Sequence, residues 1–276
     1  PVTMTGIGTL GAVYLIDGVT ATGDVIIDGL TTNAASNWSV RLGAPTKTIW
    51  SKAGNIGITG QSGGWGLYVN TNILAGDAAT PTSGGSVSLS GKSESAADTR
   101  AGLNLEAGQT VTAWGPIIVY GQVAPVNTAN WWTLADTLAG IGTLLASPVR
   151  SFNSSVTVTG YSSGSIGVQV NGGAPLTAAT TLSLTAIGSE TYGLLVTDSL
   201  IAGGDLTITA AIARADTMGM YMSVANKTIW STAGDIRINV DSKGPGADLR
   251  SPILAGNTAT PTSGGTISIA VSGGGN

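Results

Sequence analysis

The feature that most constrains the fold is a repeat that returns after 180 residues. The pentapeptide KTIWS stands at 47–51 and again at 227–231. The strings ILAG and ATPTSGG stand in the same order within 73–85 and again within 253–265, at the same offset. Self-similarity at a fixed distance is typical of proteins that stack structural units. The chain is therefore expected to contain two related copies of one arrangement.

Upstream of these matches the two copies stay related but shift by one residue. GVTATGDVII at 18–27 corresponds to SLIAGGDLTI at 199–208, an offset of 181, so one insertion or deletion separates the copies. We predict an internal duplication that relates 1–96 to 181–276 within one solenoid domain, residues 1–276. A chain of 276 residues is long enough to bury a large core as a single all-β domain.

A shorter period lies inside each copy. Each unit has three short segments in which apolar residues alternate with others, and Gly-rich turns separate the segments. Such alternation predicts strands that are buried on one side. The first segment occurs at 23–27, 54–58, 85–89, 204–208, 234–238 and 265–269; the second at 12–15, 39–42, 66–69, 102–105, 167–170, 193–196 and 219–222; the third at 48–54, 73–76, 200–203, 228–234 and 253–256.

These segments predict an all-β, three-sided parallel β-solenoid of about ten coils. No single coil can bury its apolar positions, whereas coils stacked about 4.8 Å apart share one core and pair their backbones in parallel ladders. The inward ladder is predicted to contain Val25, Ile27, Ile56, Ile58, Val87, Leu89, Leu206, Ile208, Ile236, Ile238, Ile267 and Ile269. Tight corners with the positive φ that glycine allows are predicted at Gly23-Asp24, Gly54-Asn55, Gly204-Asp205 and Gly234-Asp235.

Residues 109–151 fit this period worst and are predicted to form a small irregular or helical insertion. GPIIVYG at 115–121 also fits a strand of the solenoid. One face of a helix would carry Leu134, Leu138, Ile141 and Leu145, with Pro148 as its end. Gly140 and Gly142 oppose the helix, because each costs about 1 kcal/mol relative to alanine.

Composition bears on several function classes. The 11 basic and 15 acidic residues give a net charge of −4 and are spread singly, so nucleic-acid binding is not expected. No apolar run reaches the length of a membrane-spanning helix, about 18 residues. Cysteine and histidine are absent, which opposes a zinc or copper site. Calcium bound by Asp and backbone carbonyl oxygens stays an alternative, but the GGxGxDxUx nonapeptide is missing, and no metal or cofactor is expected. The first four residues show no secretion-signal pattern, so we expect an excised or mature fragment.

Parallel β-helices also include polysaccharide lyases and pectin hydrolases, so an enzyme has to be considered. Asp24 and Asp28 are the nearest acidic pair on one predicted strand, where they would lie roughly 13 Å apart. The paired carboxylates of glycosidases lie about 5 to 9.5 Å apart. Nucleophile triads need a base, and histidine is absent. No catalytic residue is predicted, although carboxylates brought together from different coils stay an alternative.

Aromatic residues provide the candidate binding positions. If the apolar residues at 13, 15, 40, 42, 67 and 69 point inward, then Tyr14, Arg41 and Tyr68 point outward on consecutive coils. Such a column could stack sugars, or its members could pack on one another through cation–π contacts. Trp131 and Trp132 form an aromatic pair that could be exposed as a second binding patch or packed under a loop.

The segment AGGDLTITA at 202–210, the ILAG corners and the Gly-Asp turns resemble filamentous-haemagglutinin-type exoproteins. More broadly they are similar to large β-helical adhesins that leave bacteria by two-partner or autotransporter routes. The resemblance covers nearly all of the chain except 109–151. It implies a right-handed parallel β-helix, export across a Gram-negative outer membrane, and adhesive or scaffolding work. The family's N-terminal secretion domain is not in this sequence, and no binding residue of the family maps onto it.

The expected function is therefore a non-enzymatic structural or adhesive module of a secreted bacterial surface protein, located outside the cell or at its surface. The expected partners are further copies, by end-to-end or lateral self-association or in a longer tandem array, and a surface glycan or host receptor. Two alternatives stay open on the same scaffold, a carbohydrate-active enzyme and a lectin-like glycan-binding module.

Overall fold

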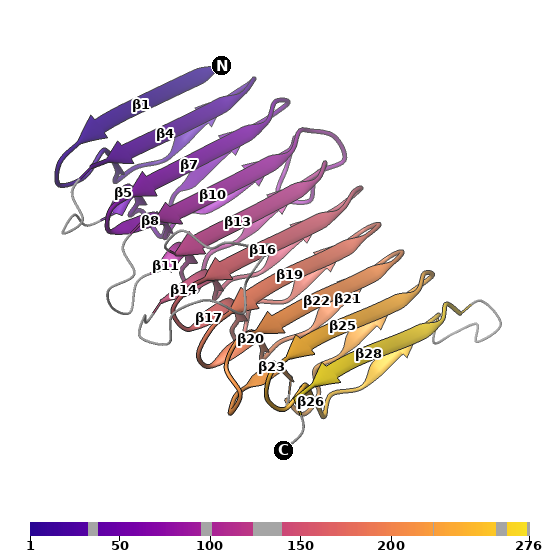
Figure 1. The fold of residues 1–276 in the computed structure, drawn as a ribbon. Helices are drawn as coiled ribbons and strands as arrows, with labels where there is room; N and C mark the ends of the chain where they lie inside the picture. The colour runs from indigo at the N-terminus through magenta and orange to yellow at the C-terminus, as the bar shows by residue number, and fades with distance from the viewer. Residues whose placement is uncertain (33–37, 95–100, 124–139, 223, 258–263, 275–276) are drawn as a thin grey trace.

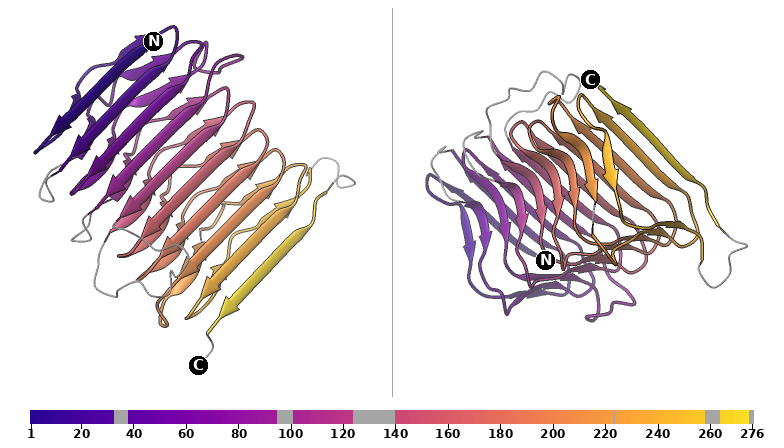
Figure 2. Two further views of the ribbon diagram at one scale, coloured as in Figure 1. Left: turned by 45° about the horizontal axis from the view of Figure 1, so that its top comes forward. Right: turned by 90° about the horizontal axis from the view of Figure 1, so that it is seen from below.

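The computed structural model describes residues 1–32, 38–94, 101–123, 140–222, 224–257 and 264–274. They form a three-sided, right-handed parallel β-helix, which confirms the predicted fold class. The coils stack along one axis from the N-terminal to the C-terminal end (Figures 1 and 2). Within the described ranges, no helix is long and apolar enough to cross a membrane.

Three parallel sheets, A, B and C, make up the three faces. Sheet A contains β1 (Val2–Gly8), β4 (Val25–Thr31), β7 (Ile56–Ser62), β10 (Val87–Ser93), β13 (Ile117–Val123), β16 (Val156–Ser162), β19 (Leu182–Gly188), β22 (Leu206–Ile212), β25 (Ile236–Ser242) and β28 (Ile267–Gly273). Sheet B contains β2 (Val13–Leu15), β5 (Trp38–Leu42), β8 (Trp65–Val69), β11 (Ala101–Leu105), β14 (Ile141–Leu145), β17 (Ile166–Val170), β20 (Tyr192–Val196), β23 (Met218–Met222) and β26 (Ala247–Leu249). Sheet C contains β3 (Val19–Ala21), β6 (Thr48–Ser51), β9 (Asn72–Ala75), β12 (Val111–Ala113), β15 (Val149–Ser151), β18 (Leu176–Ala178), β21 (Leu200–Ala202), β24 (Ile229–Ser231) and β27 (Ile253–Ala255).

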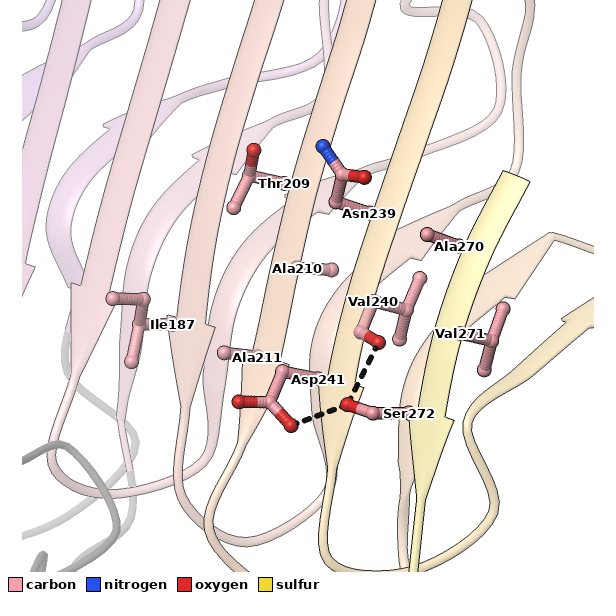
Figure 3. Close-up of a pocket in the computed structure, with 10 residues that line it drawn as sticks. All are labelled: Ile187, Thr209, Ala210, Ala211, Asn239, Val240, Asp241, Ala270, Val271 and Ser272. Atoms are coloured by element: carbon pink, nitrogen blue, oxygen red, sulfur yellow. Dashed lines mark hydrogen bonds between the residues drawn. The ribbon is translucent and has the colours of Figure 1, made fainter. Parts of the chain in front are cut away.

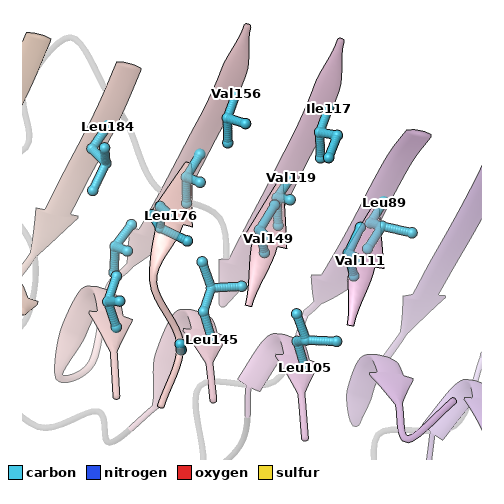
Figure 4. Packing of buried hydrophobic residues seen from close by; sticks show 14 of the residues in the cluster. Leu89, Leu105, Val111, Ile117, Val119, Leu145, Val149, Val156, Leu176 and Leu184 are labelled. Carbon is cyan, nitrogen blue, oxygen red and sulfur yellow. The ribbon is translucent and has the colours of Figure 1, made fainter. Parts of the chain in front are cut away.

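The core is one stack of aliphatic side chains that all three sheets supply (Figure 4). In sheet A the register aligns Val25 with Ile56 and Ile56 with Val87, and all three are buried. The predicted inward ladder is confirmed except at its last step. Ile267 and Ile269 on β28 are each 46% exposed, because no described strand of sheet B or C covers the inner side of β28.

Hydrogen bonds between side chains and backbone connect the corners of successive coils. The Asp24 Oδ1 accepts a hydrogen bond from the Asn55 backbone N–H at 2.7 Å, and the Asn55 Oδ1 accepts one from Ser86 N–H at 2.9 Å. In the second copy the Asp205 Oδ1 accepts from Asp235 N–H at 2.9 Å in the same way. These carboxylate and amide oxygens therefore satisfy backbone donors that the ladders leave free at the corners.

The positive φ predicted at Gly23, Gly54, Gly204 and Gly234 is wrong, because none of them adopts it. At Gly54 the reason for glycine is close approach between coils. A Cβ added to Gly54 would lie 2.4 Å from the backbone nitrogen of Asp24 on the neighbouring coil. Any side chain at this position would push two coils apart.

A second close approach occurs at the edge that sheets A and B share. The register aligns one column in sheet A that consists of Gly6, Gly29, Gly60, Gly91, Gly121 and Gly160. A Cβ on Gly121 would lie 2.0 Å from the carbonyl oxygen of Gly142 in β14. Farther along the axis the column continues with Ala186, Ala210 and Val240. Glycine is thus required because sheets A and B approach closely at these positions. The pairing of strands within sheet A does not itself require glycine.

The insertion predicted at 109–151 is wrong for the part that the structure describes. Strands β12 to β15 lie in this range and pair with the coils on either side. Ile141 and Leu145, which the spacing placed on a helix, lie instead on β14. Gly142 does not interrupt a helix but lies at the edge of sheets A and B. Residues 124–139, with Leu134 and Leu138, lie outside the described residues.

Trp50 and Trp230, which recur with the duplication, have equivalent contacts. The Trp50 Nε1–H donates to the carbonyl of Gly76 at 2.7 Å, and the Trp230 Nε1–H donates to the carbonyl of Gly256 at 2.9 Å. Both bonds run from sheet C to a corner of the next coil. The predicted structural role of this tryptophan in the coil is confirmed.

Candidate functional site

The outer face of sheet B carries the predicted Tyr14, Arg41 and Tyr68 and two aromatic residues that the sequence analysis missed. Its longer strands depart from strict alternation at their second residue, which is small and buried at the edge with sheet A. In β5 this residue is Ser39, and in β8 it is Gly66. The residue before it, Trp38 or Trp65, is half-buried. Strict period-two alternation would have placed these tryptophans inside the core.

The three residues predicted to form a column do lie together. Tyr14, Arg41 and Tyr68 occupy aligned positions on β2, β5 and β8. The Arg41 guanidinium carbon lies 5.1 Å from the centroid of the Tyr14 ring and 5.6 Å from that of Tyr68. Both distances are within the range of a cation–π contact, about 6 Å. Tyr14 is 58% exposed, so one aromatic ring of this column faces solvent.

Trp38 and Trp65 extend the column into a cluster. The Trp38 ring centroid lies 4.7 Å from that of Tyr68 and 4.3 Å from that of Trp65. We name Tyr14, Trp38, Arg41, Trp65 and Tyr68 the sheet B aromatic cluster. A signal for the two tryptophans was present in the sequence, since each stands three residues before Arg41 or Tyr68.

A cavity of about 270 Å³ opens at the N-terminal end of this cluster. Tyr14, Trp38 and Arg41 line one part of it, and the segment 10–13 lines the rest. It lies at the lower end of the range for small-ligand sites, about 300 to 1,000 Å³. Its chemistry is aromatic and apolar with one cation, which suits a flat ring with an apolar face and a polar rim.

Tyr68 is held in its neutral form. Burial raises the pKa of the Tyr68 phenol, and the nearby Glu106 carboxylate raises it further, while Arg41 acts weakly in the opposite direction. The pKa of a free tyrosine is already about 10. Tyr68 therefore remains a protonated phenol, able to donate a hydrogen bond, at any physiological pH.

The second copy of the duplication does not repeat the cluster. At the corresponding places of the same outer column, Leu195, Tyr221 and Asp248 replace the Tyr-Arg-Tyr series. The scaffold positions, by contrast, keep Trp50 and Trp230 with the same hydrogen bond. The aromatic and cationic residues are therefore not required to build a coil of this solenoid.

A larger hollow of about 650 Å³ lies over sheet A near its C-terminal end (Figure 3). Small or apolar side chains such as Ala211 and Ile187 line most of it. Its one charged side chain is Asp241, whose carboxylate accepts a hydrogen bond from the Ser272 hydroxyl at 2.6 Å. The hollow is larger than the cavity on sheet B, but it offers no comparable set of converging polar and aromatic groups.

The second predicted binding patch cannot be placed on the solenoid. Trp131 and Trp132 lie outside the described residues. In the described part of the chain, no group of three or more Asp and Glu side chains is arranged to hold a metal ion.

The comparisons with known proteins leave the site to be interpreted from its own geometry. The chain matches no protein-family model, no curated protein and no solved structure.

Proposed function

We propose that the chain is a non-enzymatic structural and adhesive module of a bacterial surface protein, a stiff segment that extends and displays binding surface. The observation that supports this proposal is the uninterrupted aliphatic core. Buried side chains from all three sheets form one cluster from Ala21 to Val240. A solenoid with a continuous core adds length with every coil and has no internal hinge to bend at.

The resemblance of the repeated corners to filamentous-haemagglutinin-type exoproteins supports a location outside the cell. Such a module would extend further by tandem copies or by association with other chains. The outer faces of the sheets carry mostly uncharged side chains, as on Thr157, Thr185 and Thr207 of sheet A. A mixed, weakly charged surface of this kind suits a stalk better than a site for a highly charged polymer.

The location can be tested with antibodies raised against the folded chain. We expect them to label the outer surface of intact cells of the source bacterium, at the same density before and after permeabilisation. Electron microscopy with gold-labelled antibody provides the measurement. Labelling that appears only in permeabilised cells would contradict the proposal of a surface module.

A second candidate function, binding of a surface glycan, is favoured by the sheet B aromatic cluster. Exposed aromatic rings beside a cation bind the apolar faces of sugar rings and their polar rims. We expect the purified chain to bind a subset of glycans on an array. Replacement of Tyr14 by alanine should weaken that binding about ten-fold, because it removes the most exposed ring.

Tyr221→Ala is the matched control, since Tyr221 lies in the same outer column within the other copy of the duplication. It should leave glycan binding unchanged. An array on which the wild-type chain binds nothing, or on which the two variants lose binding equally, would count against this second function.

A further inference from the structure

We propose that the sheet B cavity selects acidic sugars, with the Arg41 guanidinium binding the carboxylate of a hexuronic acid residue while Tyr14 and Trp38 contact its ring. This inference rests on the second proposed function, glycan binding, and names its ligand class. Four observations carry it: the absence of an acidic partner for Arg41 among the described residues, the way in which Arg41 is held, the lining of the cavity, and the divergence of the second copy.

The contacts of Arg41 within the described part of the chain are with aromatic rings and not with an acidic side chain. Among the described residues, no carboxylate lies within ion-pair distance of Arg41. Arg237 and Arg250 differ, since Arg237 contacts both Asp205 and Asp235, and Arg250 contacts Asp248 at 2.7 Å. Arg150 resembles Arg41 in stacking on a ring, that of Phe152, but of the two only Arg41 lies between two rings and lines the sheet B cavity. An exposed guanidinium whose contacts are aromatic rings keeps its planar set of donors free for an anion.

The side chains around Arg41 restrict its position before any ligand binds. Its guanidinium lies between the rings of Tyr14 and Tyr68, at 5.1 and 5.6 Å from their centroids. The Tyr14 ring in turn packs on the backbone of Gly43, where an added Cβ would lie 2.8 Å from the ring. A restrained guanidinium fork loses less conformational freedom when it binds a carboxylate than a flexible lysine would.

The lining of the cavity matches a single acidic ring better than a neutral one. Arg41 is its one charged side chain, and Leu10, Gly11, Ala12 and Val13 line it without a further ionisable group. A carboxylate that enters would meet one cation and no acidic side chain among the described lining residues. Guanidinium and carboxylate form paired, charge-assisted hydrogen bonds, which are roughly twice as strong as neutral ones. The apolar wall and the two aromatic rings are left for the C–H face of the sugar.

The duplication supplies an internal comparison. In the second copy the outer column carries Tyr221 where the first carries Arg41, and Asp248 where the first carries Tyr68. The second copy therefore has no arginine at this position of the column, and its Asp248 forms an ion pair with Arg250, while the backbone arrangement is retained. Acid recognition is expected only at the first copy, which gives the chain one site and not two.

The inference can be tested with a matched pair of probes, a tetrasaccharide that ends in glucuronic acid and the same tetrasaccharide that ends in glucose. Isothermal titration calorimetry at low ionic strength measures each dissociation constant. We expect the acidic probe to bind at least about ten-fold more tightly. Arg41→Gln should abolish the difference between the two probes, so that the acidic one binds no more tightly than the neutral one.

Arg237→Gln provides the control, because it removes an exposed arginine that already has carboxylate partners on sheet A. It should preserve the preference for the acidic probe. Equal affinity of the wild-type chain for the two probes would overturn the acid selectivity while leaving a sugar site in place. Binding of neither probe would overturn both the selectivity and the proposed glycan binding. A preference for the acidic probe that persists in Arg41→Gln would overturn the role of Arg41, because another group would then recognise the carboxylate.

Discussion

Replacement of Gly121 by alanine is expected to destabilise the solenoid by at least about 3 kcal/mol. A Cβ at this position would lie 2.0 Å from the carbonyl oxygen of Gly142, a backbone atom that cannot rotate away. Sheets A and B would have to separate at their shared edge, and the core beneath Val119 would lose contacts. Urea unfolding followed by circular dichroism measures the change.

Gly57→Ala on β7 is the matched control for Gly121→Ala. Gly57 also lies in a strand of sheet A, but it faces outward and no atom lies within 4 Å of an added Cβ. Its substitution should be neutral or stabilise by up to about 1 kcal/mol, because alanine restricts the unfolded chain. Equal stability of the two variants would mean that the close approach of the sheets does not determine the need for glycine.

Short-range patterns in the sequence predict the fold because every coil has the same apolar alternation, which must be buried. Apolar alternation in three short segments, as at Val25 and Ile27, can be buried only when coils stack, and the observed ladders follow from it. The helical spacing at 134–145 gave a wrong prediction because a glycine there could have either of two structural roles. Gly142 reads as a helix breaker in the sequence, whereas in the solenoid it is the small residue at the edge of sheets A and B.

The candidate site could be predicted only in part. The column of Tyr14, Arg41 and Tyr68 follows from alternation, and the structure brings its members together. Trp38 and Trp65 do not follow from it, because alternation is broken at the buried small residue beside each of them. The sequence also cannot give the distance from a guanidinium to a ring, or the size of a cavity. These depend on how neighbouring coils are placed against one another.

Removal of the Asp198 carboxylate is expected to have the second large effect. The Asp198 side chain is 2% exposed and accepts three hydrogen bonds. The donors are the backbone N–H groups of Gly173 and Ser199, both at 2.6 Å, and the ammonium of Lys227 at 2.7 Å. Asp198→Ala leaves two backbone donors and a cation without their acceptor. We expect a loss of about 3 kcal/mol in the free energy of unfolding at pH 7.

The duplication again offers the control, since Asp17 and Lys47 are the corresponding pair in the first copy. Their ion pair measures 2.9 Å, but the Asp17 side chain is 74% exposed. Exposed pairs contribute little, because water replaces the lost partner and salt screens the attraction. Asp17→Ala should therefore leave stability close to wild type. Asp198→Asn, which keeps the size and one acceptor oxygen, should fall between Asp198→Ala and wild type.

The effect of Asp198 should also depend on pH in a definite direction. Burial raises the pKa of the Asp198 carboxyl, but the hydrogen bonds from Lys227, Ser199 and Gly173 more than offset this, so the pKa lies below its ordinary value. A carboxyl whose folded-state pKa is depressed contributes stability above its unfolded-state pKa, about 3.9, and loses that contribution as the pH falls through the folded-state value. Wild type and Asp198→Ala should therefore differ most near pH 7 and converge below about pH 4. Urea unfolding at a series of pH values measures this difference. A gap that stays constant down to the most acidic pH would assign the effect to packing and not to the charge of Asp198.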